Sequence, residues 1–296
     1  MSNPVLAETA AEQAELKSII ERALEEDVGA GDVTTNLLVP ASVFVQARIL
    51  AKQSAVVAGG PVVSRVLHAV DPSLTMVQVA EEGAWVGDGD AVLEMSGRAQ
   101  AILTAERVCL NFLGRLSGVA TLTRQFVEAV RRWDVKIMDT RKTVPGLRLL
   151  DRYAVRVGEG ENHRSGLFDQ VLVKDNHLVV LDRLGQGLLT QKIREFRRTH
   201  PGLLVEIEVD ALDQLENVLE AEPDIVLLDN MDPDSVAEGV RRVGKRAQTE
   251  VSGGITLANV EEFARTGVDR ISIGGLTHSA KQIDFSLEIL APKELH

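Results

Sequence analysis

Residues 203–230 read LLVEIEVDALDQLENVLEAEPDIVLLDN, and this stretch decides the fold of the second half of the chain. An apolar run at residues 203–209 is followed by a helical stretch at 211–220 and a second apolar run at 225–228. Short buried strands that alternate with helices are typical of a parallel sheet with right-handed crossovers. The stretch therefore predicts one strand–helix–strand unit of an α/β domain.

The same alternation extends from Trp133 to about Gly275. Further strands are predicted at residues 135–138, 154–157, 171–173, 249–251 and 270–273, and further helices at 181–198, 233–243 and 257–266. No glycine-rich dinucleotide fingerprint follows the first of these strands, which argues against a doubly wound sheet. The pattern favours an α/β barrel of seven strands or fewer.

The first part of the chain differs from the second. Leu16, Ile19 and Ile20 share one face of a helix predicted over residues 12–27. Short β-rich runs separated by glycine-rich turns then extend to about Gly97, and one or two helices are expected over residues 101–132. These features predict a small α+β domain ahead of the barrel.

Composition restricts the function. The 296 residues carry 32 Lys and Arg against 44 Asp and Glu, a formal net charge of −12. Such a chain is unsuited to broad nucleic-acid binding, although a local basic pocket for a small anion remains compatible with it. Cys109, the single cysteine, is expected to be a buried small hydrophobe and fits a reducing cytoplasm. With no bilayer-spanning segment or secretory signal in the sequence, we expect a soluble cytoplasmic protein.

Basic side chains follow three successive predicted strands. Arg141 and Lys142 come after the first, His163 and Arg164 after the second, and Lys174 after the third. Chemistry in parallel α/β folds collects at the carboxyl ends of the strands. Because guanidinium and ammonium groups bind carboxylate and phosphate, an anionic substrate is expected there.

Carboxylates and glycine-rich turns follow the later strands. Glu206 and Glu208 alternate in an apolar strand, so both project to one side of it, and Asp229 ends the next strand. Buried carboxylates are costly without a function, which favours a functional pair. Ser252-Gly253-Gly254 and Ile273-Gly274-Gly275 offer backbone N–H groups that suit a phosphate.

These strand ends, in this order, resemble those of the quinolinate phosphoribosyltransferase family, decarboxylating enzymes that make nicotinate mononucleotide in NAD synthesis. The resemblance extends from about Glu21 to Ser279. The matching motifs are at residues 26–27, 31–34, 105–107, 111–112, 115–118, 139–143 with 145–146, 162–164, 174–177, 206–210, 228–230, 252–254 and 277–279.

The resemblance implies a fold and an activity. The expected architecture is an N-terminal α/β sandwich domain over residues 1–115, joined by residues 280–296, and an incomplete α/β barrel of the type II phosphoribosyltransferase kind over residues 116–279. The implied reaction transfers phosphoribosyl from phosphoribosyl pyrophosphate to quinolinate and releases CO2 and pyrophosphate, with Mg2+ as cofactor. The family also implies a homodimer.

The resemblance further implies roles for individual residues. Arg107 would reach quinolinate from the partner subunit. The groups that would hold quinolinate within the subunit are Arg141, His163, Arg164 and Lys174. Lys142 would lie on the phosphate side, and Glu208 and Asp229 would face the ribose hydroxyls and Mg2+. The 5-phosphate would be held by Ser252, Gly253, Gly254, Ser272, Ile273 and Gly274, and the catalytic set is Lys142, Lys174, Glu208 and Asp229.

Two alternatives stay open. One is a related enzyme of the same fold with another substrate, either nicotinate or that of the proteins associated with molybdenum-transport genes. The other is a silent barrel that senses a phosphorylated ligand. The chain also departs from the family pattern at Glu159, where the family usually has the middle of three glycines. If the loop requires a positive φ there, a side chain would strain it.

Overall fold

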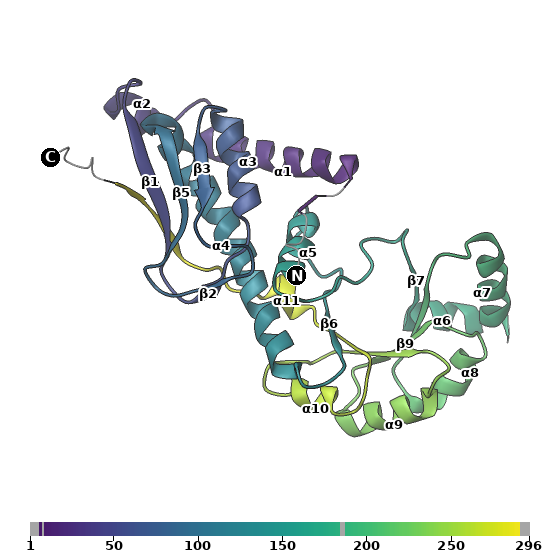
Figure 1. The fold of residues 1–296 in the computed structure, drawn as a ribbon. Helices are drawn as coiled ribbons and strands as arrows, with labels where there is room; N and C mark the ends of the chain where they lie inside the picture. The colour runs from purple at the N-terminus through teal and green to yellow at the C-terminus, as the bar shows by residue number, and fades with distance from the viewer. Residues whose placement is uncertain (1–5, 8, 184–186, 291–296) are drawn as a thin grey trace. The chain divides into compact units, whose positions relative to one another are not determined.

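The computed structural model describes residues 6–7, 9–183 and 187–290 of the chain, which fold into two compact units (Figure 1). Within the described residues, the first unit takes in those up to 124, residues 143–159 and those from 275 onward. The second unit takes in residues 125–142 and 160–274. Residues 291–296, part of the expected first domain, lie outside the described residues.

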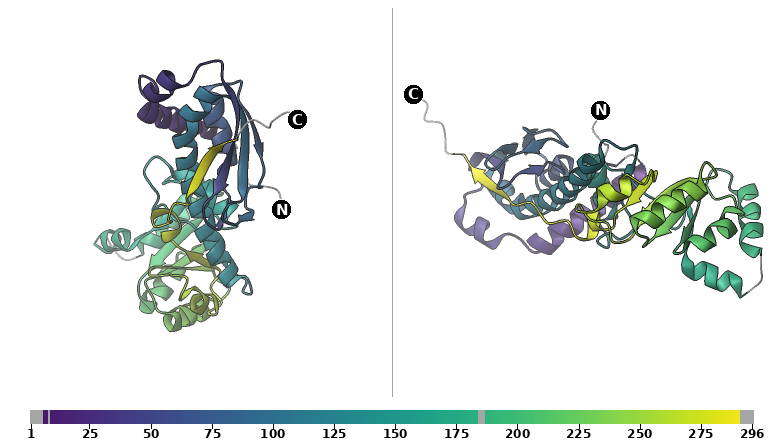
Figure 2. Two further views of the ribbon diagram at one scale, coloured as in Figure 1. Left: turned by 90° about the vertical axis from the view of Figure 1, so that its left-hand side faces the viewer. Right: turned by 90° about the horizontal axis from the view of Figure 1, so that it is seen from below.

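The first unit contains a four-stranded antiparallel sheet in the order β12-β1-β5-β3. Its strands are β1 (Phe44–Ala51), β3 (Thr75–Gln78), β5 (Ala91–Arg98) and β12 (Phe285–Ile289), and β2 (Ala55–Val56) pairs with β4 (Trp85–Val86). The ribbon shows β12 beside β1 although they are far apart in sequence (Figures 1 and 2). Ile49 faces Leu93 and Leu287 across this sheet, and burial of such side chains supplies the core.

Helices complete the first unit. They are α1 (Ala10–Val28), α2 (Val33–Leu38), α3 (Gly60–Val70), most of α4 (Ala99–Val130), α5 (Arg148–Val157) and α11 (Gly275–His278). Helix α1 begins at a capping box, in which the Thr9 side chain accepts from the Glu12 backbone N–H and the Glu12 side chain accepts from the Thr9 N–H. Cys109 is buried in α4, as predicted, and burial raises the pKa of its thiol to about 12.

The 32-residue helix α4 continues through two glycines that the sequence would allow to break it. A Cβ at Gly114 would lie 2.7 Å from the Ile283 carbonyl oxygen, and one at Gly118 would collide with the Lys281 carbonyl. The Ile283 N–H donates to the Gly114 carbonyl at 3.0 Å. These glycines therefore let the returning C-terminal segment lie directly against the helix backbone.

The second unit contains a six-stranded parallel sheet in the order β6-β11-β10-β9-β8-β7. Its strands are β6 (Lys136–Met138), β7 (Val171–Val173), β8 (Val205–Val209), β9 (Ile225–Asp229), β10 (Gln248–Ser252) and β11 (Arg270–Ser272). The connecting elements are α6 (Asp175–Asp182), α7 (Leu188–Thr199), η1 (Leu212–Gln214), α8 (Leu215–Leu219), α9 (Pro233–Val243) and α10 (Val260–Ala264). The predicted α/β fold class, with an antiparallel-sheet domain and an incomplete barrel, is confirmed.

One predicted strand is wrong. Residues 154–157 belong to helix α5, whose buried residues Leu150, Tyr153, Ala154 and Val157 recur at helical spacing. The apolar run is thus one face of an amphipathic helix whose other face carries charged residues, and a short run does not distinguish the two structures. The helix expected over residues 181–198 is also different, because α6 ends at Asp182 and α7 begins at Leu188.

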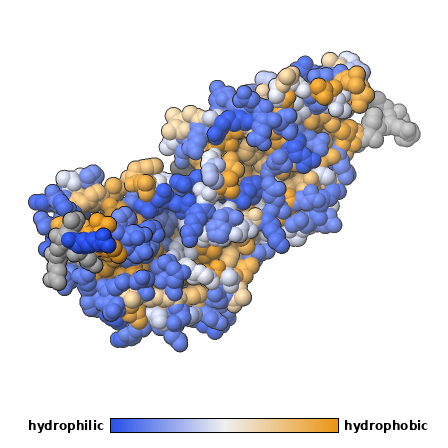
Figure 3. Space-filling view, turned by 180° about the vertical axis from the view of Figure 1, so that it is seen from behind, coloured by the Kyte–Doolittle hydropathy of each residue, from blue (hydrophilic) through white to orange (hydrophobic). Residues whose placement is uncertain are grey.

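The outer surface is largely hydrophilic on the face drawn in Figure 3. Among the described residues, no helix combines the length and the apolar composition needed to cross a bilayer.

We expect Gly118→Ala to lower the free energy of unfolding by about 2 kcal/mol, since overpacking a close backbone contact typically costs 1–3 kcal/mol. Urea unfolding followed by circular dichroism measures this loss. Gly202→Ala is the matched control, because nothing lies within 4 Å of the added Cβ. Equal stability of the two variants would contradict the proposed backbone contact.

Candidate functional site

The predicted site residues of the second unit gather at the carboxyl edge of its parallel sheet. Parallel strands place the segments that follow them along one edge. The residues on or directly after these strands are Arg141 and Lys142 (β6), Lys174 (β7), Glu208 (β8), Asp229 (β9), Ser252, Gly253 and Gly254 (β10), and Ser272, Ile273 and Gly274 (β11). Arg107 lies in the first unit, exposed on α4.

His163 and Arg164 reach the same edge by a different route from the predicted one. The segment before them pairs with β6, since Glu161 bridges Met138 and its N–H donates to the Ile137 carbonyl at 2.8 Å. His163 and Arg164 therefore follow a short extended segment that pairs with β6, and not a strand of the sheet as predicted. A helix precedes this segment where the sequence predicted a strand.

The buried carboxylate of Asp139 holds this segment in place. Its Oδ2 accepts from the Asn162 side-chain amide at 2.7 Å, and its Oδ1 accepts from the His163 backbone N–H at 2.6 Å. Asp139 is fully buried, so its carboxylate depends on these hydrogen bonds in place of water. Asp139 thereby fixes the loop that carries His163 and Arg164.

Arg141 and Arg164 form a pair of like charges. Burial lowers the pKa of Arg164, and the neighbouring Arg141 guanidinium lowers it further. The Nε atoms of both arginines are buried without a hydrogen-bond partner, and within the described residues neither side chain forms an ion pair. Two partly buried guanidinium groups in this state favour a ligand with more than one negative charge.

Lys174 forms an ion pair with Glu208 at 2.7 Å, which joins the ends of β7 and β8. The Lys174 side chain is 47% exposed, whereas that of Glu208 is only 8% exposed. His177 accepts the Lys174 backbone N–H through Nδ1 at 2.9 Å. The ammonium group thus lies at the surface of the site on a locally fixed backbone.

Asp229 is held at both carboxylate oxygens. The Ser252 hydroxyl contacts Oδ1, and the Asn230 amide donates to Oδ2 at 2.7 Å. Gly253 has a φ of +95°, and a Cβ there would lie 2.7 Å from the Asn230 side-chain carbon. Only glycine fits this turn, because its backbone passes close to the Asn230 side chain, which itself donates to Asp229.

The remaining predicted phosphate-side residues differ in exposure. Lys142 is exposed, and its N–H donates to the Thr140 hydroxyl at 3.1 Å. The Ser272 hydroxyl is buried and donates to the Val251 carbonyl at 3.5 Å. Ile273 is buried, with its N–H donating to the Met138 carbonyl. At the end of β11, the groups available to a phosphate are therefore mainly backbone groups, including those of Gly274.

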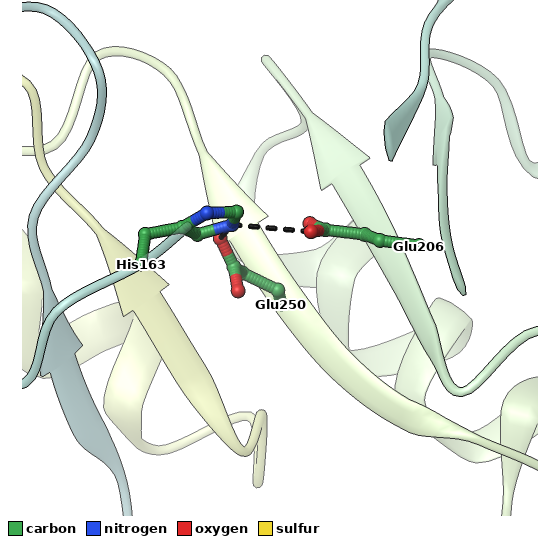
Figure 4. A group of neighbouring side chains, drawn as sticks. All are labelled: His163, Glu206 and Glu250. Carbon is green, nitrogen blue, oxygen red and sulfur yellow. Dashed lines mark ion pairs between the residues drawn. The ribbon is translucent and has the colours of Figure 1, made fainter. Parts of the chain in front are cut away.

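Behind the strand ends lies a buried cluster of His163, Glu206 and Glu250 (Figure 4). His163 Nε2 is 3.1 Å from Glu206 Oε2 and 3.3 Å from Glu250 Oε1. Burial by itself disfavours a charged imidazole, but the hydrogen bonds and charges of the two carboxylates outweigh it and raise the pKa of His163. Burial also raises the pKa of Glu206. The His163 imidazole and the Glu206 carboxyl therefore stay protonated to a higher pH than they would in water.

Sequence reasoning missed Asp139 and Glu250. Glu250 alternates with Gln248 and Ser252 on β10, the same period-two signal that marked Glu206 and Glu208. Asp139 begins the motif that contains Arg141 and Lys142, but nothing in the sequence shows that its carboxylate accepts from residues 162 and 163.

Glu159 lies in the first unit with a φ of +68°, the conformation in which a side chain was expected to be strained. Its carboxylate forms an ion pair with Arg124 at 3.2 Å. Arg124 also donates to the Val157 carbonyl at 3.3 Å, so the ion pair is tied to the backbone beside Glu159. The glutamate therefore gains a contact that glycine would lack.

Two family models match the chain. The one described as the N-terminal domain of quinolinate phosphoribosyl transferase matches residues 32–117, and the one described as its C-terminal domain matches residues 119–288. The chain is 42% identical over 280 residues to the nicotinate-nucleotide pyrophosphorylase [carboxylating] of Mycobacterium leprae, a match that covers 92% of this chain and 96% of that protein.

Solved structures resemble the whole chain as well. NadC from Streptococcus pyogenes is 36% identical with a TM-score of 0.87, over 96% of this chain and 100% of that one. The nicotinate-nucleotide pyrophosphorylase from Francisella tularensis is 33% identical with a TM-score of 0.86, over 94% of this chain and 96% of that one.

We expect Asp169→Asn to remove an acid-sensitive contribution of about 1 kcal/mol to stability, a value reduced for its partial exposure. Burial would raise the pKa of Asp169, but hydrogen bonds from Ser165 and Gly166 outweigh it and lower the pKa to about 2. A lowered folded-state pKa stabilises the protein above about pH 4, and this stability is lost as the pH falls toward 2. Urea unfolding at pH 5 and 2.5 should show a smaller loss for the variant than for the wild type. If the variant and the wild type lost the same stability between pH 5 and 2.5, Asp169 would not be a source of the acid-sensitive stability.

Proposed function

The chain belongs to the quinolinate phosphoribosyltransferase family, and from this premise we propose which residues carry its reaction. It is a decarboxylating transferase of de novo NAD biosynthesis. It transfers phosphoribosyl from phosphoribosyl pyrophosphate to quinolinate and gives nicotinate mononucleotide, pyrophosphate and CO2. The observation that best supports its site assignment is the like-charge pair Arg141 and Arg164 at the strand ends.

Arg141, Arg164 and Lys174 bind the two carboxylates of quinolinate. A dicarboxylate relieves the repulsion between the two guanidinium groups and accepts charge-assisted hydrogen bonds from them. Lys174 gives up part of its contact with Glu208 when it turns to the substrate. The family resemblance also implies that His163 binds quinolinate. We assign it instead a place behind these cations, because both nitrogens of its ring contact other groups of the chain.

Phosphoribosyl pyrophosphate binds on the other side of the sheet edge. Glu208 and Asp229 face its ribose, and Lys142 reaches its phosphate side. The 5-phosphate is held by the turns Ser252-Gly253-Gly254 and Ser272-Ile273-Gly274, whose backbone N–H groups suit an anion. The positive φ of Gly253 supports this assignment, because it requires a glycine, and a residue without a side chain leaves the backbone N–H accessible to a phosphate.

Mg2+ fits the acidic side of this site. Magnesium in such enzymes binds through one or two carboxylates together with substrate phosphates and water. Glu208 and Asp229 supply two carboxylates on adjacent strands, β8 and β9, in keeping with that donor set. The ion would neutralise charge on the leaving pyrophosphate.

The chemistry needs no covalent nucleophile from the chain. The bond from ribose C1 to pyrophosphate breaks with oxocarbenium character, and the Glu208 and Asp229 carboxylates favour that positive charge. The pyridine nitrogen attacks C1, the ring becomes cationic, and the adjacent carboxylate leaves as CO2. The electron pair left on that carbon is stabilised by the neighbouring N⁺ and takes up a proton. Positioning and electrostatics are the main catalytic terms.

We further propose that the enzyme is a cytoplasmic homodimer that uses Arg107 across its interface. The family resemblance suggests this arrangement, and Arg107 is exposed on α4, as a residue that reaches a partner must be.

A direct assay tests the substrate. Purified protein is incubated with Mg2+, phosphoribosyl pyrophosphate and either quinolinate or nicotinate, and nicotinate mononucleotide and CO2 are measured. We expect product with CO2 from quinolinate. Product from nicotinate alone would favour the related transferase, and no product from either would favour the silent sensor.

We expect Arg164→Ala and Lys174→Ala each to raise the KM for quinolinate about tenfold to a hundredfold, because a charge-assisted hydrogen bond contributes about 1.5–3 kcal/mol. The circular dichroism spectra should stay unchanged. Arg194→Ala and Lys192→Ala are the matched controls, on the exposed face of α7 in the same unit. A near-normal KM for either site variant would refute its assigned role.

Mixing two inactive variants tests the shared site. If Arg107 acts on the partner's substrate, equal amounts of Arg107→Ala and Lys174→Ala subunits should recover about one quarter of wild-type activity, because half of the dimers then have one intact site. The mixture is assayed after subunit exchange, with each variant alone as the control. No recovery despite demonstrated exchange would place Arg107 in its own subunit's site.

A further inference from the structure

The loop 164–170 joins the extended segment beside β6 to strand β7, and Arg164 is its first residue. The whole loop lies in the second unit. An arginine side chain has several rotatable bonds, so holding it in one orientation costs conformational entropy. Affinity increases when the fold already holds such a side chain before the ligand arrives. The contacts within this loop therefore affect how well Arg164 can bind an anion.

The Asp169 carboxylate closes the first turn of the loop. Its Oδ2 accepts from the Ser165 backbone N–H at 2.7 Å and from the Ser165 hydroxyl at 2.6 Å. Its Oδ1 accepts from the Gly166 N–H at 2.9 Å. One carboxylate thus fixes the backbone of the two residues that directly follow Arg164, through hydrogen bonds to a charged acceptor.

The charge of Asp169 acts on Arg164 as well. The donors that Asp169 binds in the turn are neutral, so they leave its negative charge in place. Burial and the Arg141 charge lower the pKa of Arg164, whereas the charges of Glu206 and Asp169 act in the opposite direction. Asp169 therefore supports both the backbone and the positive charge of Arg164.

Gln170 closes the other end of the loop. Its backbone carbonyl accepts from Arg164 Nη1 at 3.3 Å, and its side-chain amide donates to Glu206 Oε2 at 2.5 Å. Glu206 is fully buried on β8, so this amide joins the end of the loop to the sheet. Because a guanidinium group is a rigid plane, a hydrogen bond to one of its nitrogens also restricts the other two.

We propose that Asp169 and Gln170 are positioning residues, which close the loop 164–170 and hold the Arg164 guanidinium in the orientation that binds quinolinate. This proposal rests on the proposed role of Arg164. Both residues act through Arg164 and not on the substrate itself. Asp169 acts through the backbone of Ser165 and Gly166, and Gln170 acts through its carbonyl, which its side chain holds in place.

Asp169→Asn tests the closed turn. The new amide places an N–H donor where Ser165 or Gly166 already donates, so at least one charge-assisted hydrogen bond is lost. We expect the KM for quinolinate at pH 7 to rise about tenfold, with little change in kcat or in the KM for phosphoribosyl pyrophosphate. Calorimetric titration with quinolinate should show the same loss of affinity without turnover. Asp213→Asn is the matched control, since it removes an exposed carboxylate from the same unit.

Gln170→Leu tests the other end of the loop, and it serves equally if Asp169→Asn fails to fold. It removes the amide that contacts Glu206 and keeps the backbone carbonyl that contacts Arg164. We therefore expect a smaller rise in the KM for quinolinate, about threefold, again without a change in the KM for phosphoribosyl pyrophosphate.

A double variant separates positioning from a general structural role. If Asp169 acts through Arg164, adding Asp169→Asn to Arg164→Ala should raise the KM for quinolinate by less than about twofold, because the residue that it positions is gone. A further rise of about tenfold would overturn the proposal. So would a normal KM for quinolinate in both Asp169→Asn and Gln170→Leu while Arg164→Ala raises it. If Arg164→Ala itself leaves this KM unchanged, the proposed role of Arg164 fails, and the positioning proposal fails with it.

Discussion

The parallel hydrogen bonding of β8, β9 and β10 is the constraint on which the site depends. Every second side chain of these strands points to the same face, and the register places Glu208, Leu227 and Glu250 at one level across the sheet. The next level up the strands holds Asp229 and Ser252, which contact each other. A slip of one residue in any of these strands would move its polar groups to the helix-covered face.

Buried carboxylates fix the backbone of the site, and positively charged guanidinium groups line its surface. Asp139 is fully buried and fixes the loop backbone at His163, whereas the guanidinium groups of Arg141 and Arg164 remain without carboxylate partners among the described residues. Preformed cations of this kind cost stability, because like charges repel and their hydration is reduced. An anionic ligand at the proposed site would restore that energy on binding, which would let a chain of net charge −12 bind polyanions at one place.

Much of this arrangement could be predicted from the sequence. Strands with distinctive apolar runs, such as β8 and β9, and helix α9 lie where the pattern predicts them. The predicted secondary structure was wrong where a short apolar run is compatible with both a strand and a helix. Residues 154–157 look like a strand on their own, and only the earlier buried positions of α5 show that they continue a helical face. The two glycines of α4 were equally ambiguous, because their reason is a distant segment that passes against the helix.

The sequence by itself determined the order of the strand ends and their chemistry, since residue types and period-two alternation are local properties of the chain. It also determined the family, because many motifs occur in one order over most of the length. Only the tertiary structure decided which charges are paired. That Glu250 faces His163, that Asp139 holds the loop before Arg164 and that Arg141 lies beside Arg164 all depend on contacts between segments tens of residues apart. Electrostatic interactions depend on distance and burial, and neither exists until the sheet has brought those segments together.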